Sequence, residues 1–198
     1  MTTRAERKAE NHSKLLAAAR KVFAEKGYAA ATARDIVRET DLASGTFYNY
    51  FDGKEDAFRA VLEEFGTRAR AAAREERLRR GVSVEERMYK AYRAYFQLVI
   101  TDPEMFEVLR RNADQIAMLG GEDLFVDAIN ELMEDMRQWV DEGQLPAGVS
   151  EHLVYIARTL AGGGFQVAVH IADEGVTDVD EAARFCTRLI MDGLRGLG

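Results

Sequence analysis

Residues 44–51, SGTFYNYF, combine hydroxyls, an amide and aromatic rings without a single charge. Hydroxyl and amide groups hydrogen-bond to phosphate oxygens and to the edges of bases. The segment is too polar for an ordinary core helix and too aromatic for an ordinary solvated one. These side chains suit a short helix that lies against DNA.

The residues before this segment predict a helix and a tight turn. Thr32 and Asp35 have the spacing of a capping pair, and Ile36 supplies an apolar face. Asp41 is predicted to take the left-handed conformation at the turn, because Asp tolerates it better than most residues, and Leu42 follows as an apolar plug. Together the segments predict a helix-turn-helix.

The second helix of this motif needs an inward and an outward face. Phe47 and Phe51, four residues apart, are the predicted inward anchors, and Gly45 allows the backbone to approach a DNA groove. Arg34 and Lys54 are predicted to supply positive charge from the neighbouring helices. The residues left for the outward face and its flanks are Ser44, Gly45, Thr46, Tyr48, Asn49 and Tyr50.

Over about residues 13–60 the chain resembles the TetR family of bacterial transcriptional repressors. The shared pattern is T-x-R-x-I, then a turn, then G-T-F-Y-x-Y-F and a lysine three residues later. The resemblance implies base or groove contacts from Arg34, Ser44, Gly45 and Tyr48. It implies phosphate contacts from Thr32, Thr46, Asn49, Tyr50 and Lys54.

Three positions depart from the family pattern. Asp41 replaces the usual turn glycine, Thr40 replaces the small residue before it, and Ala43 replaces the usual capping serine. Because alanine offers no side-chain acceptor, the second helix is predicted to have a weak cap or to begin at Ser44.

The net charge of −7 is unevenly distributed along the chain. Residues 1–51 carry +3 and residues 52–198 carry −10. A basic head can meet phosphates while an acidic body repels them, which favours one orientation on DNA. The single cysteine, Cys186, excludes an intramolecular disulfide and fits a reducing cytoplasm. We expect no membrane span and no signal peptide.

The remaining pattern predicts an all-α fold. We expect residues 1–52 to form a three-helix DNA-binding domain and residues 53–198 to form a larger helical domain for ligand binding and dimerisation. The capping residues, glycines and two prolines divide the chain into about nine helices. Their predicted ranges are 13–26, 32–40, 44–50, 53–79, 83–100, 103–118, 122–142, 150–173 and 178–196.

Three consecutive glycines, Gly162, Gly163 and Gly164, lie inside a helical pattern. Each costs about 1 kcal/mol relative to alanine there, and close approach of a partner helix would offset that cost. The last helix offers an apolar stripe that includes Phe185 and Leu189. These residues predict a dimer interface, and the family resemblance implies a four-helix dimer bundle from the same two helices. The alternative is a local helix break at the glycines.

Aromatic residues of the middle helices form either an ordinary core or a ligand pocket. The family resemblance implies a pocket for a small, mostly apolar effector in this domain, and His170 is a candidate polar group. Binding would shift the dimer to a state that releases DNA. The candidate ligand-binding residues are Tyr92, Phe96, Phe106, Phe125, Trp139, Phe165 and His170.

The sequence thus predicts a regulator whose dimer binds a palindromic, double-stranded operator, with no metal and no cofactor. Two other classes remain open. A helical adaptor that binds only proteins would lack the uncharged polar face and the basic head. An enzyme is disfavoured because the three histidines do not have metal-ligand spacing and no phosphate-binding glycine loop follows a strand.

Overall fold

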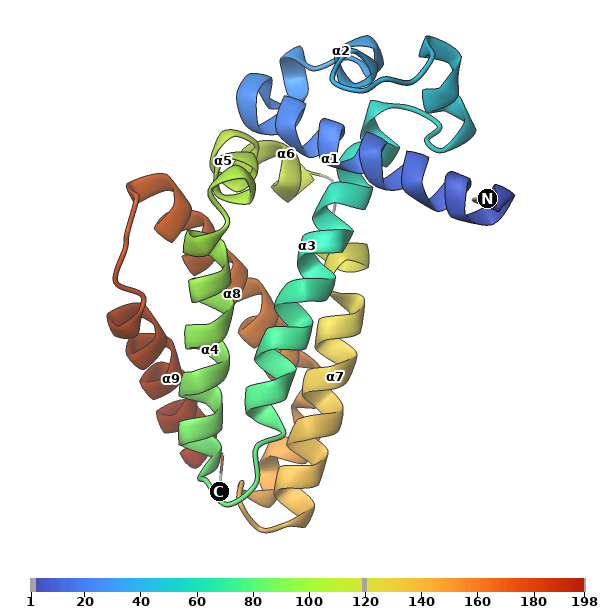
Figure 1. Ribbon diagram of the computed structural model, residues 1–198. Coiled ribbons are helices and arrows are strands. Elements are labelled where there is room, and N and C mark those ends of the chain that lie inside the picture. Colours follow the sequence, from blue (N-terminus) through green and yellow to red (C-terminus); the bar gives the residue numbers. More distant parts are fainter. Residues whose placement is uncertain (1–2, 119–120, 198) are drawn as a thin grey trace. The chain divides into compact units, whose positions relative to one another are not determined.

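The computed structural model describes residues 3–118 and 121–197, without the side chains of Ser44 and residues 121–124. All regular elements in these ranges are helical, which confirms the predicted all-α fold (Figure 1). The elements are α1 (Arg4–Ala30), α2 (Ala33–Arg38), η1 (Ser44–Asn49), α3 (Lys54–Arg77), α4 (Val84–Thr101), α5 (Pro103–Arg111), α6 (Ala113–Met118), α7 (Gly121–Asp141), η2 (Ala147–Glu151), α8 (Leu153–Glu174) and α9 (Asp180–Arg195), where η denotes a 3-10 helix.

Helix α1 begins nine residues earlier than predicted. Thr3 accepts a hydrogen bond from the amide of Glu6, and the Glu6 carboxylate accepts one from the amide of Thr3. This reciprocal cap starts the helix before its apolar stripe does. Near the other end, Gly27 has a positive φ of 74°, and one more turn follows it before α1 ends.

Two further boundaries differ from the prediction. The range 103–118 is divided into α5 and α6 at Asn112, and η2 precedes α8. Helix α8 runs without interruption through Gly162, Gly163 and Gly164, so the interpretation of these glycines as a helix break was wrong.

The chain forms two compact units. Unit 1 contains Met1–Phe65 and Pro103–Ala117, and unit 2 contains Gly66–Asp102 and Met118–Gly198. Helices α5 and α6 therefore pack with the N-terminal helices, and α3 contributes to both units. The predicted domain boundary after residue 52 remains a prediction.

In unit 1, α1 packs against α2 and α5. Phe23, Phe47 and Phe58 are fully buried, and the rings of Phe23 and Phe58 meet edge to face with their centroids 4.9 Å apart. Truncating such a buried ring to alanine costs about 3–5 kcal/mol, so this core fixes the helices that precede the DNA-binding segment.

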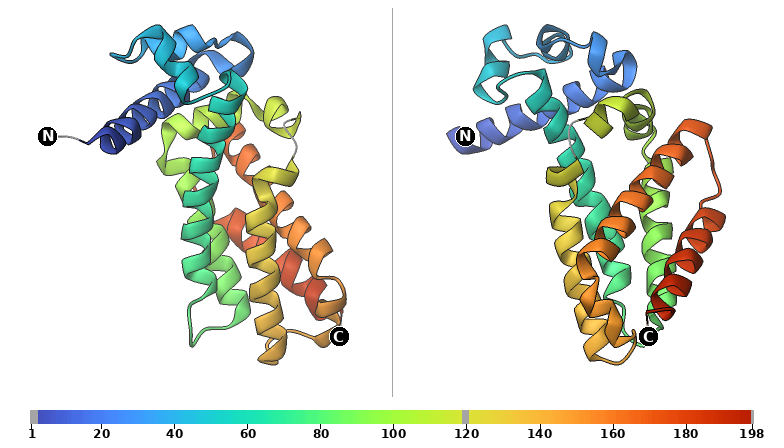
Figure 2. Two further views of the ribbon diagram at one scale, coloured as in Figure 1. Left: turned by 90° about the vertical axis from the view of Figure 1, so that its right-hand side faces the viewer. Right: turned by 180° about the vertical axis from the view of Figure 1, so that it is seen from behind.

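In unit 2, α4 lies beside α8 and α9, and α7 lies beside α8 and η2 (Figure 2). Phe96, Met136 and Trp139 are buried among them. A buried ion pair joins α3 to α7, with Arg77 Nε 2.6 Å from an Asp135 carboxylate oxygen. No described helix has the length and apolar character of a membrane span.

Candidate functional site

Two phenylalanines hold the predicted DNA-contacting segment on unit 1. Phe47 is 0% exposed and Phe51 is 3% exposed, and their ring centroids are 5.5 Å apart. Ile36 and Val37 are buried on α2, which packs against η1. The inward face therefore has the predicted anchors, and the opposite face of η1 is left for solvent or a ligand.

The outward face of η1 carries aromatic and polar groups. Tyr48 is 65% exposed, and its ring packs edge to face on Phe47 at 5.3 Å. Gly45 and Asn49 are exposed, while Thr46 and Tyr50 are partly buried. The structure thus presents Tyr48 as the most prominent side chain of this face. The predicted role of the Ser44 side chain lies outside the described residues.

The segment is a 3-10 helix with no side-chain cap at Ala43, as the missing acceptor of alanine predicts. The preceding turn differs from the prediction. No described non-glycine residue has a positive φ, so the left-handed conformation proposed for Asp41 was wrong. Instead the Thr40 hydroxyl donates to the carbonyl of Val37 at 2.8 Å and accepts from the amide of Leu42 at 3.2 Å. These bonds close the turn without a glycine.

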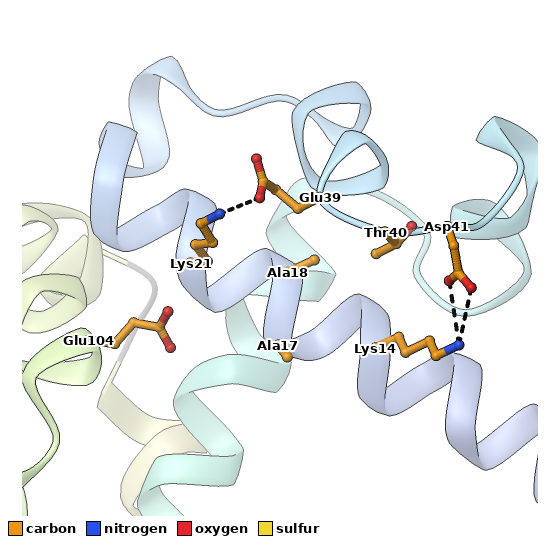
Figure 3. Close-up of a pocket in the computed structure, with 8 residues that line it drawn as sticks. All are labelled: Lys14, Ala17, Ala18, Lys21, Glu39, Thr40, Asp41 and Glu104. Atoms are coloured by element: carbon orange, nitrogen blue, oxygen red, sulfur yellow. Dashed lines mark hydrogen bonds and ion pairs between the residues drawn. The ribbon is translucent and has the colours of Figure 1, made fainter.

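An open groove of about 540 Å³ separates part of α1 from this turn (Figure 3). Two ion pairs cross it. Lys14 Nζ lies 3.4 Å from the Asp41 carboxylate, and Lys21 Nζ lies 2.5 Å from that of Glu39. Exposed pairs of this kind contribute little energy each, but both hold the turn toward α1. They also neutralise two lysines of the basic head.

The start of α2 is fixed by Thr32 and Asp35. The Thr32 hydroxyl accepts from the Asp35 amide at 3.2 Å and donates to the Asp35 carboxylate at 2.6 Å. Lys26 lies 2.8 Å from the same carboxylate, and these contacts lower the pKa of Asp35 to about 2. Thr32 is therefore a capping residue, and its predicted phosphate contact remains a prediction.

The cationic side chains in and next to the helix-turn-helix differ in whether a protein acceptor already binds them. Arg34 and Arg38 are exposed and have no acceptor among the described residues. Lys54, in contrast, donates to three backbone carbonyls at the end of α1, those of Tyr28, Ala29 and Ala31, at 2.8, 3.4 and 3.1 Å. An ammonium has three donors, so these contacts account for all of them.

The N-terminal part of α1 was not predicted from the sequence. His12 lies near Tyr50 and Phe51, with ring centroids 6.1 and 5.3 Å apart, so this part of α1 passes the end of η1. It also carries Arg4, Arg7 and Lys8. The Thr-x-x-Glu spacing at residues 3–6 was the signal that would have identified this extension.

The candidate ligand-binding residues do not form one group. In unit 2, Tyr92 stacks on Phe96 at 5.7 Å, Phe125 meets Phe165 edge to face at 5.2 Å, and Trp139 is buried. Phe106 belongs to unit 1, so the structure does not bring it together with them. His170 is exposed on α8, which contradicts its interpretation as a core or pocket group.

The candidate dimer residues do not all lie on an exposed face. On α9, Phe185 is 56% exposed and Leu189 is 64% exposed, one turn apart. A Cβ added at Gly162 or Gly163 meets nothing within 4 Å, whereas one at Gly164 would lie 3.1 Å from the ring of Tyr92. Gly164 is therefore needed for packing inside unit 2 and is not part of the exposed face.

Sequence comparison relates the N-terminal segment to known regulators. The sequence profile of the bacterial regulatory proteins of the TetR family matches residues 15–61. Two Bacillus subtilis proteins described as uncharacterized HTH-type transcriptional regulators are similar to the chain. YdgC is 28% identical over 102 residues, which are 50% of this chain and 52% of YdgC. YfiR is 36% identical over 58 residues, which are 29% of this chain and 28% of YfiR. The matches thus span about half, or less, of these relatives.

Solved structures share the fold over nearly the whole chain. The fatty acid degradation regulator FadR from Bacillus halodurans has a TM-score of 0.77 at 22% identity, covering 93% of this chain and 96% of its own. A TetR-like regulator from Rhodococcus sp. RHA1 has a TM-score of 0.66 at 24% identity, covering 99% and 100%. These likenesses show the fold, and the profile match identifies its helix-turn-helix. The N-terminal residues 15–61 therefore match the bacterial regulatory proteins of the TetR family, and the rest of the chain shares its fold with solved structures.

Proposed function

We propose that the chain is a ligand-responsive transcriptional regulator that binds a palindromic operator as a homodimer. The observation that carries this proposal is the exposed face of η1. Tyr48 projects from a helix whose neighbouring side chains, Phe47 and Phe51, are buried, and Asn49 is exposed beside it. A helix anchored in this way presents its polar groups for base and phosphate contacts.

The charge of unit 1 supports the same function. Arg34 and Arg38 on α2 are exposed and unpaired among the described residues, and Arg4, Arg7 and Lys8 lie on the part of α1 that leads to His12. Free cations bind phosphates and release counterions, which gives a salt-dependent affinity. We expect the protein to act in the cytoplasm, where a bacterial regulator meets its DNA.

The exposed apolar face of α8 and α9 supports dimerisation. Tyr155 on α8 is 70% exposed, and Phe185 and Leu189 on α9 are more than half exposed. Gly163 is also exposed and allows a second helix to approach closely. We propose that two copies pack through this face, so that their recognition helices can reach half-sites about 34–36 Å apart on B-DNA.

We propose that the interior of unit 2 binds a small, mostly apolar effector beside Tyr92, Phe96 and Trp139. The hydroxyl of Tyr92 has one long contact, 3.5 Å to the carbonyl of Leu160, and burial raises its pKa, so it stays a neutral donor. Among the solved folds, FadR from Bacillus subtilis is in complex with stearoyl-CoA, with a TM-score of 0.73 at 18% identity.

Fluorescence anisotropy with a 30-bp duplex from the DNA upstream of the protein's own gene tests DNA binding. We expect specific binding that weakens as KCl rises from 50 to 200 mM, and transcription from that promoter to fall when the protein is added. An absence of salt-sensitive binding to this DNA and to fragments of its genome would reject the regulator and favour a protein-binding adaptor.

The single tryptophan provides the test of the effector site. Trp139 is 2% exposed in unit 2, so its emission reports a ligand bound beside it. We expect a member of a metabolite panel that includes fatty acids and acyl-CoA thioesters to change this emission, raise the melting temperature and release the duplex. Ligands that raise the melting temperature without changing Trp139 emission would place the site elsewhere.

A further inference from the structure

The last turn of α1 has a different direction from the rest of the helix. Gly27 takes φ 74° and ψ 159°, which no helical residue adopts, and the amide of Ala31 returns to the Gly27 carbonyl at 3.1 Å. Residues 28–31, the junction segment, lead directly into Thr32, the cap of α2. The orientation of the junction segment therefore sets where the helix-turn-helix begins.

Asn112 bonds α1 on both sides of the break. It is 4% exposed, and its side-chain oxygen accepts from the amide of Tyr28 at 2.5 Å. Its side-chain nitrogen donates to the carbonyl of Phe23 at 3.3 Å and to that of Val108, in α5, at 2.7 Å. Because the break at Gly27 removes the ordinary helical acceptor of the Tyr28 amide, Asn112 satisfies a partly buried donor that would otherwise be unpaired.

Lys54 holds the same segment through its carbonyls. The ammonium donates to the oxygens of Tyr28, Ala29 and Ala31 and lies 4.5 Å from the centroid of the Tyr28 ring. Unpaired carbonyls at the end of a helix carry partial negative charge, which a cation stabilises. The junction segment is thus bonded on its amide side by Asn112 and on its carbonyl side by Lys54.

We propose that Lys54 and Asn112 are positioning residues that fix the junction segment and, through it, the helix-turn-helix. In this role Lys54 acts on α1, and it does not supply the phosphate contact that its place in the motif implies. The expected changes in DNA affinity rest on the proposed DNA-binding function. The claim that these residues fix the junction segment concerns the free protein alone.

Lys54 and Asn112 lie in the segments through which an effector bound in unit 2 can act on the junction segment. Lys54 is the first residue of α3, and Asn112 lies between α5 and α6. These are the segments of unit 1 whose chain continues into unit 2. A conformational change that an effector causes in unit 2 would therefore reach the junction segment, which leads into α2, either through α3 or through α5 and α6. We expect the helix-turn-helix to keep the orientation that binds DNA only while Lys54 and Asn112 both stay hydrogen-bonded to the junction segment.

Salt dependence separates a positioning lysine from a phosphate-binding one. Removing one phosphate-binding cation lowers the slope of log K against log salt by about 0.9 per subunit. We expect Lys54→Gln to weaken binding to the upstream duplex about tenfold at every KCl concentration, with a slope within about 0.3 of wild type. Arg38→Gln is the matched control, because Arg38 is exposed and has no acceptor among the described residues, and its slope should fall by about 0.9 per subunit. A fall of that size in Lys54→Gln would overturn the proposal.

Amide hydrogen exchange tests the positioning role without DNA. In Asn112→Asp the carboxylate can still accept from the Tyr28 amide, but neither donor bond can form. We expect exchange to accelerate at least tenfold at amides 31–36, with little change at Val22, while the control Asn130→Asp, at an exposed position of α7, leaves both regions unchanged. Asn112→Leu, which removes all three bonds, should show the larger effect if it folds.

Unchanged exchange at amides 31–36 in both Asn112→Asp and Lys54→Gln would refute the proposal. Acceleration spread evenly over α1 to α3 would also refute it, because it would indicate global destabilisation. If the wild-type protein binds no DNA, the proposed function fails, but the exchange experiment still decides whether these residues fix the junction segment.

Discussion

Replacing Tyr48 by alanine should separate DNA binding from folding. The side chain is 65% exposed, so its removal forfeits little burial, and the main cost to the fold is its edge-to-face packing on Phe47. Such packing is worth about 0.5–1.5 kcal/mol, so the melting temperature should fall by only a few degrees. Removing one groove-binding side chain from both subunits costs about 2–6 kcal/mol, which weakens specific binding about 30-fold or more.

The assay is an anisotropy titration of the upstream duplex at fixed salt, with urea denaturation of the same preparation. Leu78→Ala is the matched control, because Leu78 is also a partly exposed apolar residue, at 45%, and lies in unit 2. Its duplex affinity should equal that of wild type. A folded Tyr48→Ala protein that keeps its affinity within threefold would refute the assignment. An equal decrease on random-sequence DNA would show that Tyr48 contacts the backbone and not the groove.

Three further predictions concern assembly and stability. Gly163→Leu should convert the dimer to a monomer by size-exclusion chromatography with light scattering, since the substituted side chain projects from the exposed face; an unchanged mass would remove this face from the interface. Asp135→Leu should lower the free energy of unfolding in urea by about 3 kcal/mol, because Arg77 keeps only Glu131, at 3.3 Å. Adding Arg77→Met should recover most of that loss, and no recovery would contradict the buried-charge argument. Asp35→Asn should be less stable than wild type at neutral pH but lose less stability on acidification. The folded pKa of Asp35, about 2, lies below its ordinary value of 3.8, so its contribution is full above that value and disappears as the pH falls through about 2; parallel pH curves would reject this origin.

Local signals predicted much of the fold. Thr32 with Asp35 begins α2 as their capping spacing indicates, and α4 begins after Ser83, where its predicted range starts. The inward anchors Phe47 and Phe51 followed from their separation of four residues and are buried. These features depend on residues a few positions apart, which is the range over which side-chain types determine a helix.

Features that depend on distant partners were predicted poorly. Residues 103–118 read as one helix because Asn112 is not a helix breaker by type, yet its amide binds Tyr28, 84 residues earlier in the chain. The turn at Asp41 was expected to need a left-handed residue, but Thr40 closes it through two side-chain bonds. The glycine run was assigned to one interface, although Gly164 faces Tyr92 and Gly163 faces outward.

Lys54 shows that a position in a motif can take a physical role other than the one the motif implies. A lysine that follows the recognition helix is placed near DNA by sequence, and charge alone favours a phosphate as its partner. In the structure its three donors already bind the carbonyls of Tyr28, Ala29 and Ala31, so contact with phosphate would require at least one of these bonds to break. Arg38, which is exposed, has no such competing acceptor among the described residues. Phosphate binding by Lys54 would therefore release the segment that orients α2, whereas phosphate binding by Arg38 leaves that segment intact.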